Sequence, residues 1–386
     1  MGIAVQREVA AAEAAAPRRA EAAPRYLFVD QLRGLIIALM GLDHASNYFN
    51  LAWKQATYNN FFFDSPGQFV LRILSYLCAP GFLMLAGAMV WLSLSKRTAQ
   101  GGRSWSARWG LIQRGAFLIL VQLVWVNASW GAFNRFRLDH FGIIATIGSA
   151  IILLTLVAHW SWRLRLGLAL AIILVHPLLL KIPYDPAQMT LGTRLMWIFI
   201  DAAEWNLYPV LPWFALAVIG SVAGEAWFRL WNDGNRVRHT VIAGLVGVAL
   251  FFVVRIPCGY GNLLPFDHVG SFSFFFVQKY PTSLPHNFLF PGLVLLCAAL
   301  FMTVGPRLRP LLHPIEIYGK TPFFFYVIHI PLLAMVTRRF PLFPYREGEV
   351  GTTLVAWVAL LVVMYPLCRW FAGVKARSKN ALIKMM

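Results

Sequence analysis

Residues 69–92 read FVLRILSYLCAPGFLMLAGAMVWL, a run in which Arg72 is the one charged side chain. An apolar stretch of about 20 residues is long enough to cross the hydrocarbon of a bilayer as a helix. Similar runs recur along the chain, in which 59% of residues are apolar and 13% are charged. A soluble domain is about half apolar and about a quarter charged. The sequence therefore predicts an all-α fold, a polytopic membrane helix bundle.

We expect about ten transmembrane helices in this bundle. They are predicted at residues 29–51, 68–93, 108–128, 141–159, 163–181, 208–228, 238–256, 286–304, 320–337 and 351–371. The segment 191–205 is shorter and carries Arg194, Asp201 and Glu204, which favours an interfacial or re-entrant helix. Two long loops, 182–207 and 257–285, lie on one side. The second is rich in Gly, Pro and Phe and is long enough to fold back as a lid.

The charge pattern predicts how the bundle is oriented. The net charge is +18, and the Lys and Arg residues lie in short loops between apolar runs, so we expect no nucleic-acid partner. One alternate set of loops carries more than twice as many of them as the other, which predicts that this set is cytoplasmic. An even number of spans then places both the N- and C-termini in the cytoplasm. Residues 1–25 are predicted to be a disordered cytoplasmic tail, and residues 26–386 the membrane domain.

A few ionisable side chains lie inside the predicted spans, where each costs roughly 2.5–3.5 kcal/mol by insertion scales. They are Asp43, His44, Arg72, Arg114 and His329. Such residues are functional candidates by default. The four cysteines, in contrast, are far apart and lack metal-binding spacing, so the sequence predicts no metal site.

His44 is the sharpest of these candidates. Gly41 precedes it by three residues and is expected to leave room for a ligand, and Asn47 and Tyr48 share its helix face. Asp43 points about 100° away and cannot orient His44 from the same helix. The alternative is a structural histidine whose ring is hydrogen-bonded by a neighbouring helix.

Arg33 lies eleven residues before His44, which is about three helical turns on one face and a rise of roughly 16 Å. That rise is comparable to an extended pantetheine arm, so the pair would suit coenzyme A with its phosphates at Arg33. Alternatively, Arg33 extends to the cytoplasmic surface. Arg114 either lines a cytoplasmic vestibule or pairs with Asp43 or a backbone carbonyl. For His329, structural and catalytic roles are equally open.

Five segments in register resemble a known family, the bacterial membrane proteins related to heparan-alpha-glucosaminide N-acetyltransferase. They are the first helix from Arg33-Gly34 through Met40 to Asp43-His44, then residues 78–87 (CAPGFLMLAG), 208–213 (YPVLPW), 279–284 (KYPTSL) and 318–331 (YGKTPFFFYVIHIP). Together they extend over most of residues 26–335.

The resemblance implies a multi-pass acyltransferase of the bacterial inner membrane. Such enzymes take acetyl-CoA as co-substrate from the cytoplasm and acylate a sugar-like or other hydroxyl or amine acceptor at the outer face; the eukaryotic relatives N-acetylate a terminal glucosamine. We therefore predict three groups of site residues. They are His44, Asp43 and His329 for catalysis, Arg33 and Arg114 for acetyl-CoA, and Lys279, Tyr280 and Asn47 for the acceptor.

The chain also departs from this family. Ser46 and Asn47 stand where the family is expected to continue with Arg-Asp, and Gln55 stands where the eukaryotic relatives carry a histidine. Those relatives have Asn at the position of His44. The base role would therefore fall to His44, either by direct proton transfer or through a covalent acetyl-histidine.

Two other functions remain alternatives. A transporter or flippase for a small solute or lipid-linked sugar is favoured by the number of spans and the long loop. A non-catalytic scaffold or sensor descended from the enzyme is favoured by Ser46 and Asn47. Gly and Ala within the spans permit close helix packing but leave open whether the chain forms a homodimer.

Overall fold

The computed structural model describes residues 26–55, 65–99, 104–134, 140–203, 206–380 and 383. Within these residues the chain forms helices, loops and three isolated bridges, which confirms the all-α prediction for the described part. The predicted disordered tail, residues 1–25, lies outside the described residues, as do Glu204, Trp205 and the side chain of Gln55.

Seven helices in the described part are long and apolar enough to cross a membrane. They are α4 (Pro66–Tyr76) joined to α5 (Cys78–Ala99); α6 (Ser104–Val121) continued by the π-helical turn η1 (Gln122–Val126) and α7 (Asn127–Trp130); α9 (Trp162–Leu179); α11 (Val210–Glu225) with η2 (Ala226–Leu230); α12 (Asp233–Arg255); α14 (Leu284–Val304); and α17 (Val350–Arg377). Two more predicted spans are helical as α2 (Leu27–Phe49) and α8 (Ile143–Val157), but α8 has only 15 residues. The protein is therefore a membrane protein with seven such helices, or eight with the bent pair described next.

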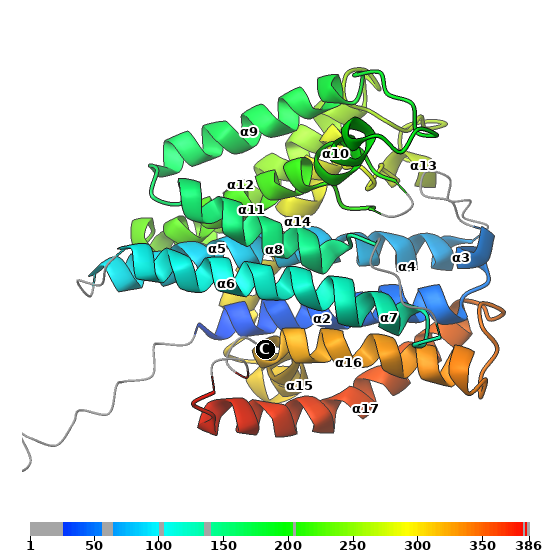
Figure 1. Ribbon diagram of the computed structural model, residues 1–386. Helices are drawn as coiled ribbons and strands as arrows, with labels where there is room; N and C mark the ends of the chain where they lie inside the picture. Colours follow the sequence, from blue (N-terminus) through cyan, green and yellow to red (C-terminus); the bar gives the residue numbers. More distant parts are fainter. Residues whose placement is uncertain are drawn as a thin grey trace, which may run out of the picture.

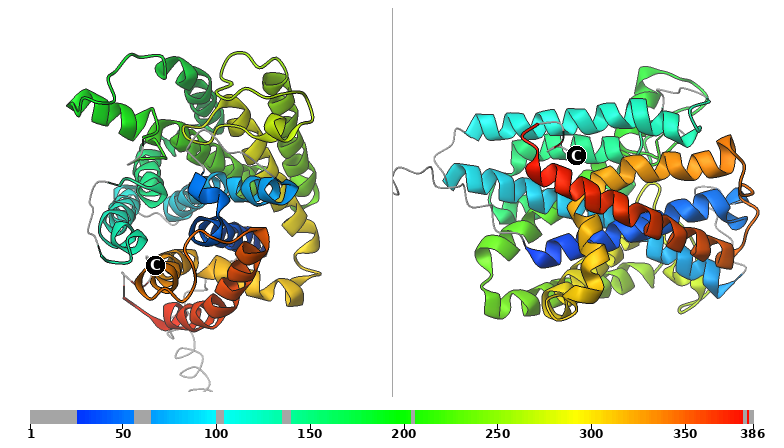
Figure 2. Two further views of the ribbon diagram at one scale, coloured as in Figure 1. Left: turned by 90° about the vertical axis from the view of Figure 1, so that its right-hand side faces the viewer. Right: turned by 90° about the horizontal axis from the view of Figure 1, so that it is seen from below.

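The predicted span 320–337 is one arm of a bent pair. α15 (Arg309–Lys320) meets α16 (Pro322–Ala334) and its continuation η3 (Met335–Arg339) at 83°. Pro322 occupies the first turn of α16, where its missing N–H is tolerated, so a new helix direction begins there. α15 was not predicted, because its Arg, His and Glu residues read as a loop. It lies across α2 and α17 (Figure 2).

The long helices run side by side, with α2 in the interior (Figure 1). α5 packs on α11, α6 on α8 and α12 on α14, while α2 is contacted by α15, α16 and α17. α9 and the nine-residue α10 (Leu191–Phe199) lie at one edge. α10 is too short to cross a bilayer, as the sequence indicated for this segment.

The contact between α2 and α15 depends on two glycines. A Cβ atom on Gly34 would lie 1.9 Å from the Ile315 carbonyl oxygen, and one on Gly319 would lie 1.8 Å from the Asp30 carbonyl oxygen. The two backbones therefore touch directly. This contact fixes the bend between α15 and α16 beside the N-terminal half of α2.

The loop after α12 folds back onto the bundle. The buried guanidinium of Arg255 holds this loop in place. It donates hydrogen bonds to the Asn262 side chain and to the carbonyls of Leu264, Ser273, Phe274 and Phe276. The loop contains the short helix α13 (Phe272–Phe275) and ends where Ser283 caps α14. Lys279, near its end, is only 2% exposed. The loop thus inserts a lysine into the bundle, while its role as a lid stays a prediction.

Candidate functional site

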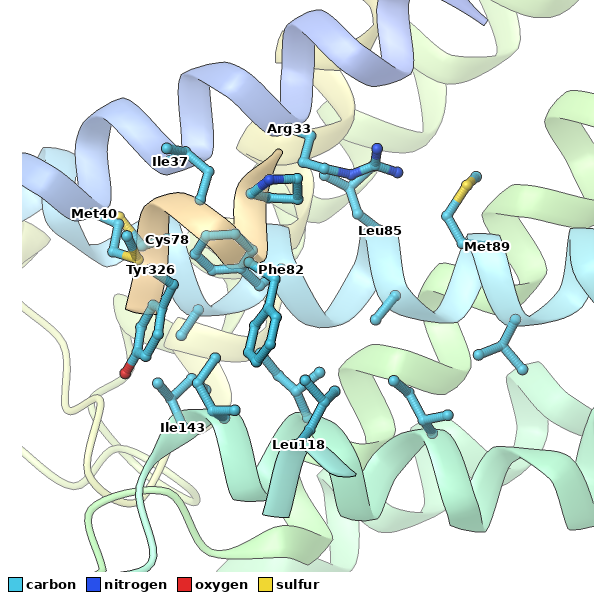
Figure 3. Close-up of a pocket in the computed structure, with 18 of the residues that line it drawn as sticks. Arg33, Ile37, Met40, Cys78, Phe82, Leu85, Met89, Leu118, Ile143 and Tyr326 are labelled. Atoms are coloured by element: carbon cyan, nitrogen blue, oxygen red, sulfur yellow. The ribbon is translucent and has the colours of Figure 1, made fainter. Parts of the chain in front are cut away.

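A cavity of about 560 Å³ runs through the bundle beside α2. Its walls come from α2, α5, α6, α8 and α16, with single residues from α15, α17 and the loops. Figure 3 shows Arg33 and Tyr326 toward opposite ends, with Ile37, Phe82 and Leu118 between them. The cavity therefore joins two polar ends through an apolar middle.

The first end carries four cationic side chains: Arg33, Arg114, Lys320 and Lys375. Arg33 Nη1 lies 3.3 Å from Asp30 Oδ1 and donates to the Gly319 carbonyl oxygen at 3.1 Å. Arg33 thus lines the cavity instead of extending to the surface. We call this end the basic mouth.

Two imidazoles meet at the opposite end. His44 Nδ1 lies 2.6 Å from His329 Nε2, and the two rings are parallel with centroids 4.9 Å apart. His329 is fully buried, and its Nδ1 lies 2.8 Å from the Phe325 carbonyl oxygen in the preceding turn. His44 lines the cavity, whereas His329 is not among the lining residues. Any effect of His329 on the cavity is therefore indirect, through lining neighbours such as His44 and Tyr326.

With both rings neutral, these contacts assign the nitrogens that carry hydrogen. A carbonyl oxygen only accepts, so Nδ1 of His329 must be the donor to Phe325. A neutral imidazole has one N–H, which leaves His329 Nε2 as the acceptor of an N–H from His44 Nδ1. Nε2 of His44 then keeps its lone pair. This is the state that a general base or a nucleophile requires.

Aromatic rings pack around His44 on the side of η3 and α7. The ring of Trp130 contacts His44 edge-on with centroids 5.1 Å apart, and the ring of Tyr48 stacks on Trp130. Arg338 donates to the Trp130 carbonyl oxygen and lies over the Tyr48 ring. We call Tyr48, Trp130 and Arg338 the aromatic cap.

Charged groups surround the same end of the cavity. Arg72 Nη1 lies 3.6 Å from Asp43 Oδ1, so Asp43 pairs with Arg72 and not with Arg114. Lys279 lines the cavity with Asp43, and its Nζ lies 5.0 Å from the centre of the Tyr76 ring. Burial by itself lowers the pKa of Lys279, but Tyr280 and the Asp43 carboxylate outweigh it and hold that pKa above its ordinary value. We call this end the reacting end.

Three other sequence predictions meet different surroundings. Tyr280 is not a lining residue, but its hydroxyl lies 3.0 Å from that of Tyr208, which is. Asn47 does not line the cavity; its side-chain oxygen accepts from Arg346 at 2.7 Å. The prediction that Gly41 leaves room for a ligand is wrong, because the side chain of Leu360 occupies that space and would lie 3.4 Å from a Cβ atom on Gly41. Gly41 therefore serves helix packing.

The basic mouth includes residues that sequence reasoning missed. Lys320 and Lys375 line it, yet in the sequence both read only as positive charge at span ends. Their positions follow from the bend at Thr321 and from the antiparallel course of α17. Tyr208 also lines the cavity and was not predicted to. It is the first residue of the segment 208–213, whose resemblance to the family could have pointed to it.

No metal centre is found in the part of the chain that the structure describes, where no three His, Cys, Asp or Glu residues gather. His176 has a structural contact: its Nε2 lies 2.7 Å from the carbonyl oxygen of Ile200, at the end of α10. The imidazole pair is thus the arrangement here with acid–base chemistry.

A model of a known family matches much of the chain. The family model described as heparan-alpha-glucosaminide N-acetyltransferase, catalytic, matches residues 25–253, more than half of the chain. The protein belongs to this family. No curated protein matches the chain. The matched range includes Asp43 and His44, while Lys279 and His329 lie beyond it and are brought to the site by the fold.

Proposed function

We propose that the protein transfers an acetyl group from acetyl-CoA to an acceptor at the reacting end of the cavity. One observation carries the proposal: a single cavity joins four cations to the imidazole of His44, whose Nε2 keeps its lone pair when both rings of the pair are neutral. The rise of roughly 16 Å between Arg33 and His44 matches an extended pantetheine arm.

The basic mouth would hold the phosphates of acetyl-CoA. Guanidinium and ammonium groups form charge-assisted hydrogen bonds to phosphate oxygens, and Arg33 is already held in place by Asp30 and Gly319. The apolar middle, with Ile37 and Phe82, would surround the pantetheine arm. The thioester would then lie beside His44.

His44 Nε2 would take the proton of the attacking acceptor as its oxygen or nitrogen bonds to the thioester carbon. The C–S bond breaks, and the proton passes to the leaving thiolate. A positioned base contributes roughly 10²–10⁴-fold. The alternative is attack by His44 itself, which forms acetyl-histidine before the acceptor arrives. Both routes use the same lone pair.

Orientation completes the proposal. The basic mouth lies at the end of α2 that the loop charges assign to the cytoplasm, where acetyl-CoA is found. The acceptor would then be acylated toward the outer face of the bacterial inner membrane. The first helix, with Arg33 near one end and His44 near the other, would be the route of the acetyl group.

The test uses purified protein, acetyl-CoA with a labelled acetyl group, and an extract of the cell envelope as the source of acceptor. We expect labelled product with the wild type and at least a 100-fold loss in His44→Ala. His159→Gln is the matched control, because His159 is exposed and lies outside the cavity lining. Undiminished transfer by a folded His44→Ala variant would rule out the assignment.

A transporter predicts a different result in reconstituted vesicles. It would move solute without any acyl donor, and acetyl-CoA would not raise its melting temperature. A thermal shift with acetyl-CoA that weakens in Arg33→Gln would favour the transferase.

A further inference from the structure

Lys279 faces the cavity at the reacting end, and no oxygen of the described residues accepts a hydrogen bond from its Nζ. It is 2% exposed, its Nζ lies 5.0 and 5.1 Å from the ring centres of Tyr76 and Tyr280, and the Asp43 carboxylate is its nearby opposite charge. A buried ammonium has three N–H donors that need acceptors. Oxygen atoms of a bound ligand would meet that need.

The charges at this end sum to a positive value. Lys279 and the buried Arg72 are cations, and Asp43, which pairs with Arg72, is the anion. Among the described lining residues the other carboxylate is Asp30, which lies at the basic mouth beside Arg33. The hydrogen bonds of the two imidazoles are satisfied with both rings neutral, and a proton on His44 would only add to the positive charge.

A positive reacting end discriminates between amines and alcohols. An alkyl amine is largely an ammonium at neutral pH, so it would enter beside Lys279 with the same sign of charge. It would also have to lose one proton before attack, besides the proton that its nitrogen loses on forming the amide. A hydroxyl group enters uncharged and has one proton to give.

We propose that the acceptor is an alcohol, such as a sugar hydroxyl, on a neutral or anionic molecule, and that the product is an O-acetyl ester. Lys279 would bind an oxygen of the acceptor next to the reacting hydroxyl. The hydroxyl oxygen bonds to the acetyl carbon as the C–S bond breaks, and His44 passes the hydroxyl proton to the thiolate. The products are the ester and free coenzyme A thiol, with no net release of protons.

This inference rests on the proposed acetyl transfer, so the experiment separates the two. Purified protein receives labelled acetyl-CoA with glucosamine, N-acetylglucosamine, methyl glucoside or glucuronate. We expect at least tenfold more label on the three acceptors without a free amine than on glucosamine, and we expect alkaline hydroxylamine to release that label, as it does from oxygen esters but not from amides.

Label that goes mainly to glucosamine and resists hydroxylamine would overturn the inference and leave the transferase intact. Label on none of the four acceptors would count against acetyl transfer itself, and with it against this inference.

A charge variant tests the role of Lys279. In Lys279→Met we expect the preference for N-acetylglucosamine over glucosamine to fall at least fivefold, and Lys279→Arg should retain it. Lys181→Met is the control, because Lys181 is exposed beyond α9 and does not line the cavity. An unchanged preference in a Lys279→Met protein with wild-type melting temperature would overturn the assignment.

Discussion

His329 differs from His44 in that it cannot touch a substrate. It is fully buried, and its Nε2 is used by His44. Its effect would be to hold the His44 ring in one tautomer and to accept a share of the positive charge when His44 is protonated. We therefore propose that His329 is a positioning residue, much as a carboxylate orients a histidine in other acyl-transfer sites.

A pair of variants separates positioning from packing at this residue. His329→Leu should lower kcat about 10- to 100-fold with little change in KM for acetyl-CoA, because misplaced catalytic groups cost rates of this order. His329→Gln should recover part of the loss, since its amide oxygen can accept the N–H of His44. Steady-state kinetics check both values. Equal losses in Leu and Gln variants of equal stability would contradict the positioning role.

Arg33 and Arg114 lead to a prediction about the donor. Their hydrogen bonds to phosphate would be worth about 1.5–3 kcal/mol each. Arg33→Gln and Arg114→Gln should therefore raise KM for acetyl-CoA about tenfold or more. Acetyl-pantetheine, which lacks the nucleotide phosphates, should show almost no change. A matching rise for both donors would mean that the arginines support the fold alone.

At the scale of elements, the packing of α2 against α15 is the most restrictive contact near the site. Gly34→Ala or Gly319→Ala would force a methyl group into a carbonyl oxygen of the other helix. Overpacking of this kind typically costs about 1–3 kcal/mol. We expect the melting temperature of either variant to fall by several degrees.

Gly167 gives the matched control for this experiment. It lies within α9, and a Cβ there would meet nothing within 4 Å. Gly167→Ala should leave stability unchanged or raise it, because alanine favours the helix by about 0.5–1 kcal/mol. A loss of stability in Gly167→Ala equal to that in Gly34→Ala would show that the close contact is not the cause.

The same elements show which features of the fold could be predicted from the sequence. The long spans and the spacing of Arg33 and His44 depend on local periodicity, which one chain reveals by itself. The pairing of His44 with His329 depends on how α16 packs against α2 after an 83° bend, and no local pattern encodes that angle. Gly41 was misread for a related reason: neighbouring helices decide which face of α2 meets the cavity.

At the scale of the whole molecule, the orientation in the membrane is open to a direct test. Cys258 lies just after α12 in the loop assigned to the outer side, and it is the one exposed cysteine, with Cys78 and Cys368 buried and Cys297 partly covered. A maleimide that cannot cross membranes should label Cys258 in intact cells. Cys258→Ser should abolish this labelling. Labelling only in inverted vesicles would place the loop, and the reacting end, in the cytoplasm.

The aromatic cap has a consequence beyond acetyl transfer. A cavity lined by the Asp43 carboxylate and the His44 imidazole, with His329 behind it, is also a potential path for protons across a bilayer. Tyr48 and Trp130 place flat hydrocarbon surfaces next to His44, where a file of water would otherwise conduct. By closing this path, the two rings would help to preserve the electrochemical gradient of the membrane. Trp130 would thus limit proton leakage across the membrane, besides packing against His44.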